Sequence, residues 1–412
     1  MDEGRLDREA LARLAVGVLT VDPVERAVLV HDLDSVDARL TRLATAAPGA
    51  DIAVAVKANP LVGLLRHCVD RGTGLECASH EEVALARAAG CSAGRIVVDG
   101  PAKTHAELVD ALAAGHVVHA DRFGELEAMS KLDTSRALVG LRIDPGVAPG
   151  AIPDTTTTGP SSQFGIDLSR HRASVIEAYR RHAFLKSLHV HVGSQGMPMR
   201  SLLDAAEAAV ALGDAIERAG GRLSSLDLGG GFPVVYRPGD APFALDAWSD
   251  AIRCLGIDAR GWALRLEPGR WIHAGAGFAL SRVAGIKEVG GEPAVILHVG
   301  ADLLPRRALR PDLWFHEIVV LDEQGALKEG SLRPTTVVGP LCFSGDRLGV
   351  SMPLPRVEEG DLVVVRDVGA YAMGLWSRHC SRGMPPVWGH QGGRWNLLRR
   401  GERPEDIVAF WS

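Results

Sequence analysis

The sequence predicts an α/β protein in which a (β/α)8, TIM-like barrel is followed by an antiparallel β-domain, and three observations predict it. Strand-like and helix-like runs alternate from residue 27 to residue 266, as in βα units that build a parallel sheet. Nine strand-like runs can be counted there, and about eight strands are enough to close a barrel. After about residue 275 the helical periods stop, and short β-rich runs separated by Gly, Pro and Asp follow.

The elements follow from these patterns in chain order, after a polar, helix-like opening. The expected barrel strands are 27–31, 52–56, 74–77, 95–98, 117–119, 137–143, 184–192, 223–228 and 262–266. The expected helices are 34–46, 61–71, 80–89, 104–113, 122–130, 170–181, 199–219 and 244–255. Residues 145–162, rich in Pro, Gly and Thr, are interpreted as an inserted loop near the site. The later β-rich runs are 278–289, 293–299, 315–321, 335–338 and 362–366. We therefore expect a barrel at 27–275, and a β-domain formed by 276–412 together with 1–26.

Composition excludes several classes of function. The net charge of -6 and the scattered Lys and Arg residues leave no basic face for nucleic acid. The first residues are charged, and no apolar stretch reaches the length of a membrane span, so we expect a cytoplasmic protein without a membrane partner. The six cysteines show no metal-ligand spacing, and neither a metal site nor a disulfide framework is expected. Small-molecule chemistry is the class that remains.

Lys57 is the first candidate for chemistry. The run from Ile52 to Val56 has the character of a buried strand, and Asn59 and Pro60 end it, so Lys57 is expected at the carboxyl end of that strand. In a β/α barrel, active sites are built at this end. A lysine whose ammonium form is disfavoured by burial can attack a carbonyl group. The alternative, a surface lysine that extends into solvent, is the commoner case.

His189 and His191 alternate in a strand and therefore point to one face. No cysteine or acidic residue lies near them in the chain, so they make a poor metal site. A flat imidazole can stack on a planar cofactor, whereas a hydrogen-bonded core histidine is the ordinary alternative.

Two further strand ends carry candidate residues. Gly229, Gly230 and Gly231 directly follow a strand, where bare backbone N–H groups can turn toward a phosphate, although a tight loop explains the pattern about equally well. Glu267 and Arg270 end the next strand around a Pro-Gly turn, for which a surface turn is the alternative. All these signals fall at carboxyl strand ends of one predicted barrel, and that coincidence favours an active site.

The motifs also resemble, in their order along the chain, those of the diaminopimelate/ornithine decarboxylase family. That family consists of pyridoxal phosphate (PLP) enzymes with an alanine-racemase-like barrel, fold type III. The matching motifs are Lys57–Asn59, Glu76–Ser79, His189–Gln195, Gly229–Pro233, Glu267–Arg270, Gly339–Cys342 and Asp367–Tyr371. The resemblance covers about residues 27 to 390 and implies the fold and the cofactor.

The resemblance also implies roles for particular residues. Lys57 would carry PLP, His191 would stack on its ring, and Glu267, with Arg142 beside it, would pair with the pyridine nitrogen and keep it protonated. The residues that would hold the phosphate are Ser194, Gly229, Gly230, Gly231 and Tyr371. Cys342 would reach the partner subunit's site from the β-domain and return a proton to the α-carbon, which makes the active unit a homodimer with shared sites.

The specificity end of the site departs from the family pattern. An acidic residue usually follows the donor cysteine and pairs with the distal ammonium of the substrate, but this chain has Phe343. Burying an ammonium against phenylalanine without a partner costs several kcal/mol. The family string Arg-Pro-x-Leu-Tyr is also changed, because residues 310–314 end in tryptophan. The candidate substrate-binding residues are therefore Arg270, Arg306, Arg310, Phe343 and Tyr371, of which the arginines could receive an anionic group.

These observations predict a PLP-dependent carboxy-lyase that removes the α-carboxyl group of an unusual or conjugated amino acid in a specialised-metabolite or siderophore pathway. The alternative is diaminopimelate decarboxylase of lysine biosynthesis, or an ornithine or lysine decarboxylase. A non-catalytic regulatory relative is a third reading, but it would have no need to retain Lys57, Glu267 and Cys342 together.

Overall fold

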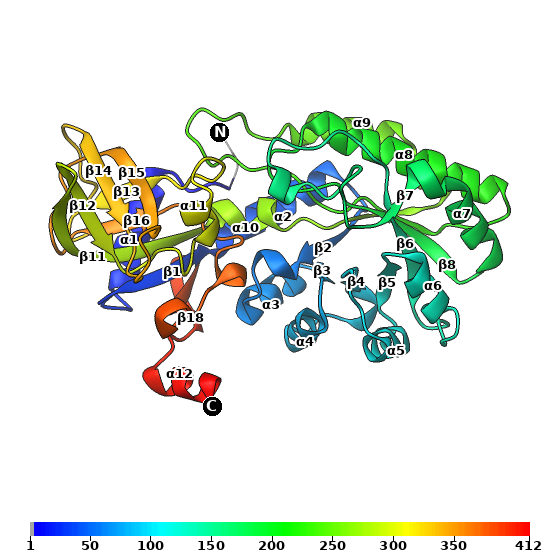
Figure 1. The fold of residues 1–412 in the computed structure, drawn as a ribbon, viewed down its shortest axis with the longest axis horizontal. Helices are drawn as coiled ribbons and strands as arrows, with labels where there is room; N and C mark the ends of the chain where they lie inside the picture. Colours follow the sequence, from blue (N-terminus) through cyan, green and yellow to red (C-terminus); the bar gives the residue numbers. More distant parts are fainter. Residues whose placement is uncertain (1–3) are drawn as a thin grey trace. The chain divides into compact units, whose positions relative to one another are not determined.

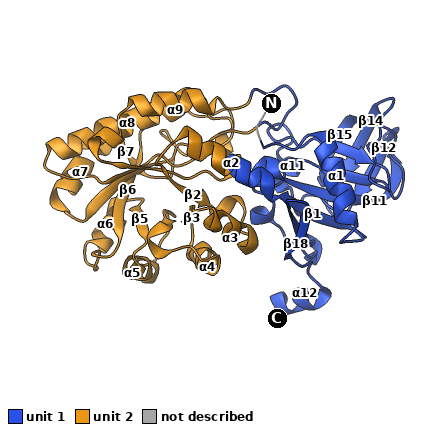
Figure 2. Ribbon diagram, turned by 180° about the vertical axis from the view of Figure 1, so that it is seen from behind, with its two compact units in different colours: residues 1–39, 235–241, 272–412 blue, residues 40–234, 242–271 orange. Residues whose placement is uncertain are grey.

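The structure is a computed structural model that describes residues 4–412, and it divides into two compact units (Figure 1, Figure 2). The barrel unit, unit 2 in Figure 2, comprises residues 40–234 and 242–271. The β unit, unit 1 in Figure 2, comprises the chain up to residue 39 and residues 235–241 and 272–412.

Eight parallel strands close a barrel within residues 51–266. They are β2 (Asp51–Ala55), β3 (Gly74–Cys77), β4 (Ile96–Val98), β5 (Val117–Ala120), β6 (Leu138–Asp144), β8 (Leu185–Val190), β9 (Ser225–Asp227) and β10 (Ala263–Leu266). Each pairs with the next in this order, and the pairing of β10 with β2 closes the ring. A short strand, β7 (Ile166–Asp167), pairs with the end of β6. The predicted barrel is confirmed.

Helices connect these strands and lie outside them (Figure 1). They are α3 (Val62–Asp70), α4 (His80–Ala88), α5 (His105–Ala114), α6 (Phe123–Met129), α7 (Leu168–Arg181), α8 (Met199–Arg218) and α9 (Leu245–Cys254), and α2 (Leu33–Ala46) precedes β2. Their starts follow from the sequence: Thr104 and Glu107 form a reciprocal capping box on α5, and Ser79 Oγ accepts the N–H of Glu82 at the start of α4.

The β unit is built on a mixed sheet of strands β1 and β11 to β18. Their bounds are β1 (Ala27–Asp32), β11 (Gly277–Val289), β12 (Glu292–Leu297), β13 (Ile318–Leu321), β14 (Arg333–Val338), β15 (Arg347–Leu354), β16 (Leu362–Val365), β17 (Val387–Gln391) and β18 (Arg394–Arg399). The expected antiparallel arrangement holds for most pairs, but β1 with β17 and β12 with β14 are parallel. A second domain built on a sheet is therefore present, with mixed rather than purely antiparallel topology.

The first strand lies in a different unit from the one expected. The sequence predicts residues 27–31 in the barrel, but β1 pairs with β11 and β17 of the mixed sheet, and the barrel unit begins at residue 40. All six residues of β1 are buried, as in a barrel strand that is covered on both faces. Periodicity alone does not distinguish these two environments.

Helices of the β unit complete the fold. They are α1 (Arg8–Leu19), α10 (Arg270–His273), α11 (Pro305–Leu309) and α12 (Pro404–Trp411), α10 beginning at the end of the barrel unit. The apolar face of α1, including Leu11 and Val18, packs on β1, β11, β13 and β16, and Asp7 caps its first turn by accepting the N–H of Ala10. In residues 4–412 no helix is both long and apolar enough to cross a bilayer.

Candidate active site

Lys57 lies directly after β2, in the short 3-10 helix Val56–Ala58, at the carboxyl end of the barrel. Its Nζ is 2.5 Å from Oε2 of Glu76, the residue before the end of β3. The Glu76 side chain is fully buried, whereas that of Lys57 is 38% exposed, so the lysine is less buried than the sequence suggested. The structure thus places the predicted amine at a strand end, held by a carboxyl group and open on one side.

Four carboxyl groups gather in the interior of the barrel, on Glu76, Asp99, Asp227 and Glu267. Each comes from the end of a different strand, β3, β4, β9 and β10, and none of the four residues is more than 5% exposed. Carboxyl oxygens of Asp99 and Glu267 lie within 4.8 Å of each other, and so do those of Asp227 and Glu267. Carboxyl groups that are this close together and this deeply buried cannot all be ionised at the same time.

Burial and neighbouring charges shift the pKa values of these carboxyl groups in different directions. Burial raises the pKa of Glu76 well above its usual range, although the charge of Lys57 opposes this. Burial also opposes ionisation of Asp99, but Lys57, His189 and Arg142 together hold the pKa of Asp99 well below its usual value. Asp99 is therefore the ionised member of this pair at neutral pH, and Glu76 is the member that retains a proton.

Glu267 follows β10 and faces the same interior. Burial raises its pKa to about 7, with the charge of Asp99 adding to this and Lys57 opposing it. Its Oε2 is 3.2 Å from His189 Nε2, while its Oε1 has no hydrogen-bond partner among residues 4–412. One oxygen of a buried carboxyl group is thus left available to a ligand.

The two predicted histidines both face the interior, in different surroundings. His189, in β8, is fully buried and stacks on His119 with ring centroids 4.7 Å apart. His191 follows β8, and its Nδ1 accepts the N–H of Gly230 at 3.1 Å, which fixes the tautomer with the proton on Nε2. Burial and the charges of Arg142 and Lys57 hold the pKa of His191 well below its usual value, so this ring is neutral.

His189 has acidic neighbours in space, although none lies near it in the chain. Asp99 Oδ2 is 3.8 Å from His189 Nε2, and Glu267 Oε2 is closer still. These contacts could not be predicted from the sequence, because the three residues are far apart in the chain and come from different strands of the closed barrel.

The glycine-rich turn after β9 is packed so tightly that only glycine fits. Gly229 and Gly231 have φ angles of +64° and +104°. A Cβ at Gly230 would lie 2.2 Å from the carbonyl oxygen of Glu267, and one at Gly231 would lie 2.4 Å from that of Gly193. Near this turn, the Oγ of Ser194 accepts a hydrogen bond from Arg270 Nε at 3.1 Å. Arg270 itself is buried.

Arg142, in β6, is also in the interior. Its Nη1 is 3.6 Å from Asp99 Oδ2 and its Nε is 3.9 Å from Asp121 Oδ1. The sequence placed Arg142 beside Glu267. The structure pairs it with the two aspartates, and its charge reaches Glu267 by acting to lower the pKa of that carboxyl group.

The remaining candidates lie in the β unit. Cys342 and Phe343 are exposed residues of the loop between β14 and β15, and the loop is anchored by Asp346, whose carboxylate accepts the N–H groups of Leu341 and Ala301. The guanidinium of Arg306 lies 4.8 Å from the ring centroid of Tyr371.

Arg306 also lies 5.0 Å from the ring centroid of Trp314, so two aromatic rings flank its guanidinium. Arg310 forms an ion pair with Asp312 at 3.2 Å. Tyr371 has a φ of 56°, an uncommon backbone conformation for a residue with a side chain.

Sequence reasoning gave no role to Asp99 or Asp227, and it included Glu76 only as part of a motif. The signal was present, because each is an acidic residue at the carboxyl end of a predicted barrel strand. The rule that singled out Lys57 would have selected them as well.

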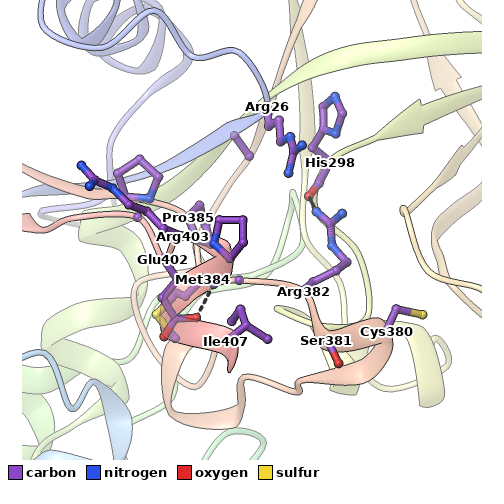
Figure 3. A pocket seen from close by; sticks show the side chains of 15 residues that line it. Arg26, His298, Cys380, Ser381, Arg382, Met384, Pro385, Glu402, Arg403 and Ile407 are labelled. Atoms are coloured by element: carbon purple, nitrogen blue, oxygen red, sulfur yellow. Dashed lines mark hydrogen bonds between the residues drawn. The ribbon is translucent and has the colours of Figure 1, made fainter. Parts of the chain in front are cut away.

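A cavity of about 480 Å3 lies in the β unit (Figure 3). Arg26, His298, Arg382 and Arg403 are among its lining residues, and Arg382 donates to the carbonyl oxygen of His298 at 2.7 Å. None of the predicted site residues lines this cavity.

Comparison with known proteins agrees with this geometry. The family model "Pyridoxal-dependent decarboxylase, pyridoxal binding domain" matches residues 33–274, more than half of the chain. The diaminopimelate decarboxylase of Actinosynnema pretiosum subsp. auranticum is 34% identical over 92% of this chain and 87% of its own length. That of Deinococcus radiodurans is 32% identical over 92% of this chain and 94% of its own. The crystal structure of diaminopimelate decarboxylase from Helicobacter pylori complexed with L-lysine superposes with a TM-score of 0.86 at 25% identity, covering 94% and 97% of the two chains.

A chain with an amine and buried carboxyl groups at the strand ends of its barrel is thus matched over 92% of its length by decarboxylases. The chain belongs to the pyridoxal-dependent decarboxylases. It is a PLP-dependent carboxy-lyase that acts on an amino acid.

The residues present fit the cofactor that this family uses. Lys57 supplies an amine at the mouth of the barrel, and Glu267 Oε1 is a buried acceptor without a hydrogen-bond partner in the described chain. The turn at Gly229 to Gly231 is bare backbone, since a Cβ at any of the three glycines would lie under 3 Å from a neighbouring protein atom. These are the features that an aldehyde, a pyridine nitrogen and a phosphate require.

Proposed function

We propose that this decarboxylase acts on diaminopimelate. The observation that carries the proposal is the 34% identity to a diaminopimelate decarboxylase over 92% of the chain, which spans both units rather than the cofactor-binding barrel alone. The comparisons favour this alternative over the reading of a specialised-metabolite or siderophore enzyme. The product would be lysine, since loss of one carboxyl group from diaminopimelate leaves a 2,6-diamino monocarboxylic acid.

The barrel unit supplies the residues that would hold the cofactor. Lys57 would bind it covalently through Nζ, and Glu267 would hold the pyridine nitrogen in its protonated form through Oε1. His191 would lie against the ring as a neutral imidazole. When bound, PLP supplies an electron sink for the electron pair that remains as CO2 leaves.

The phosphate would be held by backbone and hydroxyl groups. The N–H groups of Gly229 and Gly230 are donated to Asp227 and His191, so within this turn the N–H of Gly231 is the candidate for the phosphate. Ser194 offers a hydroxyl whose position Arg270 fixes. Tyr371 of the β unit is the further candidate for this role. The buried guanidinium of Arg270 therefore supports a place at the phosphate end rather than the substrate-binding role suggested by sequence alone.

Cys342 would complete the reaction from the β unit of the partner subunit in a homodimer. The bond between the α-carbon and the carboxyl carbon breaks, CO2 leaves, and Cys342 Sγ–H would add a proton to the α-carbon. The exposed loop that carries Cys342 is consistent with a group that serves a site outside its own barrel. Exposed apolar side chains on α12, with Phe410 58% and Trp411 64% exposed, also suit a surface that a second copy covers.

A second substrate class is favoured by one specific observation. Phe343, 40% exposed, follows Cys342 where the family usually carries an acid. An amino acid with an uncharged, acylated or anionic distal group would need no such acid, and Arg306, fixed between Trp314 and Tyr371, could receive an anion.

A panel assay of CO2 release separates the two substrate classes. The purified protein, loaded with PLP, would be given diaminopimelate, ornithine, lysine, an N-acylated diamino acid and an acidic amino acid in parallel. We expect diaminopimelate to be decarboxylated with lysine as product, and the Lys57→Ala variant to release no CO2 from any of them. Rapid turnover of the acylated or acidic compound without turnover of diaminopimelate would overturn the proposal and support the second class.

A further inference from the structure

Asp227 and Glu267 lie side by side in the barrel interior, at the ends of the neighbouring strands β9 and β10. Both are buried, and oxygen atoms of the two carboxyl groups lie within 4.8 Å of each other and of a nitrogen of His119. In a site from which water is excluded, two carboxylates at this separation repel each other strongly, and one proton is retained between them.

The two carboxyl oxygens of Asp227 differ in their hydrogen bonds. Oδ1 accepts the N–H of Gly229 at 2.9 Å. Oδ2 is buried and accepts no hydrogen bond from any group in residues 4–412. An acceptor left without a donor in the interior is costly, whereas a hydroxyl oxygen that carries a proton needs only an acceptor. The carboxyl group of Glu267, with an oxygen within 4.8 Å of one of Asp227, is the neighbouring group that can serve as that acceptor.

The charges around the two groups decide which one keeps the proton. Glu267 faces Lys57 and Arg142, whose charges favour its ionised form, and Asp99, which opposes it. Asp227 faces Glu267 itself, and its cationic neighbour Arg265 is already paired with Asp51 at 2.8 Å. His189 also faces both carboxyl groups, and burial lowers the pKa of His189, so this ring is neutral.

The balance of these effects favours a neutral Asp227. Burial, followed by the charge of Glu267, raises the pKa of Asp227 to about 8, and burial also raises the pKa of Glu267. The charges of Lys57 and Arg142 favour an ionised Glu267, which leaves the shared proton to Asp227.

We propose that Asp227 is a positioning residue that acts as a neutral carboxylic acid. It donates its proton in a hydrogen bond to Glu267, and so keeps Glu267 ionised with Oε1 turned to the pyridine nitrogen of the cofactor. The same carboxyl group accepts the Gly229 N–H through Oδ1, so it couples the orientation of Glu267 to the turn that would hold the phosphate. This inference rests on the proposed role of Glu267, but not on which amino acid is decarboxylated.

Infrared spectroscopy can locate the proton directly. A protonated carboxyl group has a C=O stretching band at higher frequency than the amide band, and it shifts in D2O. We expect Asp227→Asn to remove one such band from the spectrum at neutral pH, and Asp144→Asn to leave the spectrum unchanged. Asp144 is a matched control, because it is buried at a strand end and its oxygens accept only N–H and hydroxyl groups. Loss of the band in Glu267→Gln but not in Asp227→Asn would place the proton on Glu267 and overturn the proposal.

Cofactor affinity provides the second readout. Asparagine can still donate to Glu267 and accept from Gly229, so Asp227→Asn should keep the dissociation constant for PLP near that of the wild type. Asp227→Leu removes the donor and should weaken PLP binding by about tenfold or more, the usual cost of losing a hydrogen bond to a charged group. Equal weakening in both variants would mean that Asp227 acts as an anion, which contradicts the proposal. These measurements use no substrate, so failure of the diaminopimelate assay would leave their outcome unaffected.

Discussion

At the scale of single residues, the main feature of this site is which of its buried carboxyl groups carry a proton. Three of the four acidic side chains in the barrel interior, those of Glu76, Asp99 and Glu267, face the charge of Lys57, whereas Asp227 faces Arg265. Burial raises the pKa values of Glu76, Asp227 and Glu267. Asp99 alone among the four has a lowered pKa, because it lies against several cations. An interior of this kind holds protons at neutral pH that ordinary surface carboxyl groups would have released.

The sequence located Lys57, Glu267 and the glycine turn because each directly follows a strand. It gave no means of finding which carboxyl group retains a proton. That property depends on distances between strands far apart in the chain, such as those that bring Asp99 and Glu267 together.

One prediction at the residue scale concerns stability and pH. The folded-state pKa of Asp227 is raised from 3.8 to about 8, so its contribution to the free energy of unfolding is fully present below pH 3.8 and is lost as pH rises towards 8. Each pKa unit corresponds to about 1.4 kcal/mol, so the loss amounts to several kcal/mol. Asparagine cannot ionise. Asp227→Asn should therefore gain stability relative to the wild type as pH rises across this range.

Urea unfolding of both proteins, followed by circular dichroism at several pH values, measures this difference. Stability curves that run parallel with pH would contradict a neutral, buried Asp227. Asp144→Asn serves again as the control. Its free energy of unfolding is not expected to rise relative to the wild type as pH rises.

At the scale of elements, the barrel was predictable and the sheet of the other unit was predictable only in part. Alternating strand and helix periods identified each barrel strand, because parallel barrels repeat one local unit. The strands β15, β17 and β18 were missed, since their burial patterns are irregular or largely exposed. The position of β1 could not be predicted, because its partners come from the far end of the chain.

The glycine turn yields a prediction at this scale. Gly230→Ala would place a Cβ 2.2 Å from the carbonyl oxygen of Glu267, which is backbone and cannot move away cheaply. The turn and Glu267 would have to shift together, so we expect PLP affinity to fall by about tenfold or more. Gly94→Ala is the matched control, because a Cβ at Gly94 meets no atom within 4 Å. Fluorescence titration with PLP measures both variants, and equal affinity in the two would show that the turn does not contact the cofactor.

At the scale of the whole molecule, the expected homodimer and the cytoplasmic location stay predictions. The dimer matters for chemistry, because Lys57 and Cys342 belong to different units of the chain. If the two residues meet across subunits, each single variant is inactive, but a hybrid dimer of one subunit of each kind contains one intact site.

Mixing Lys57→Ala with Cys342→Ala tests this arrangement. With complete exchange, about half of the dimers are hybrids, so recovery to roughly a quarter of wild-type activity is expected from the symmetry of a two-site dimer. Subunit exchange would be verified with differently tagged chains. No recovery despite verified exchange would mean that Cys342 serves its own chain's site or takes no part.

The central claim is that Lys57 carries the cofactor, and borohydride reduction followed by peptide mass spectrometry tests it most directly. Reduction fixes the bond between PLP and the lysine to which it is attached. We predict one modified peptide, which contains Lys57. In Lys57→Ala we expect neither the adduct nor the visible absorbance band of the unreduced PLP–lysine bond, whereas Lys186→Ala, a variant of a lysine in β8, should keep both. An adduct on any other lysine, such as the buried Lys103, or an unchanged absorbance band in Lys57→Ala, would contradict it.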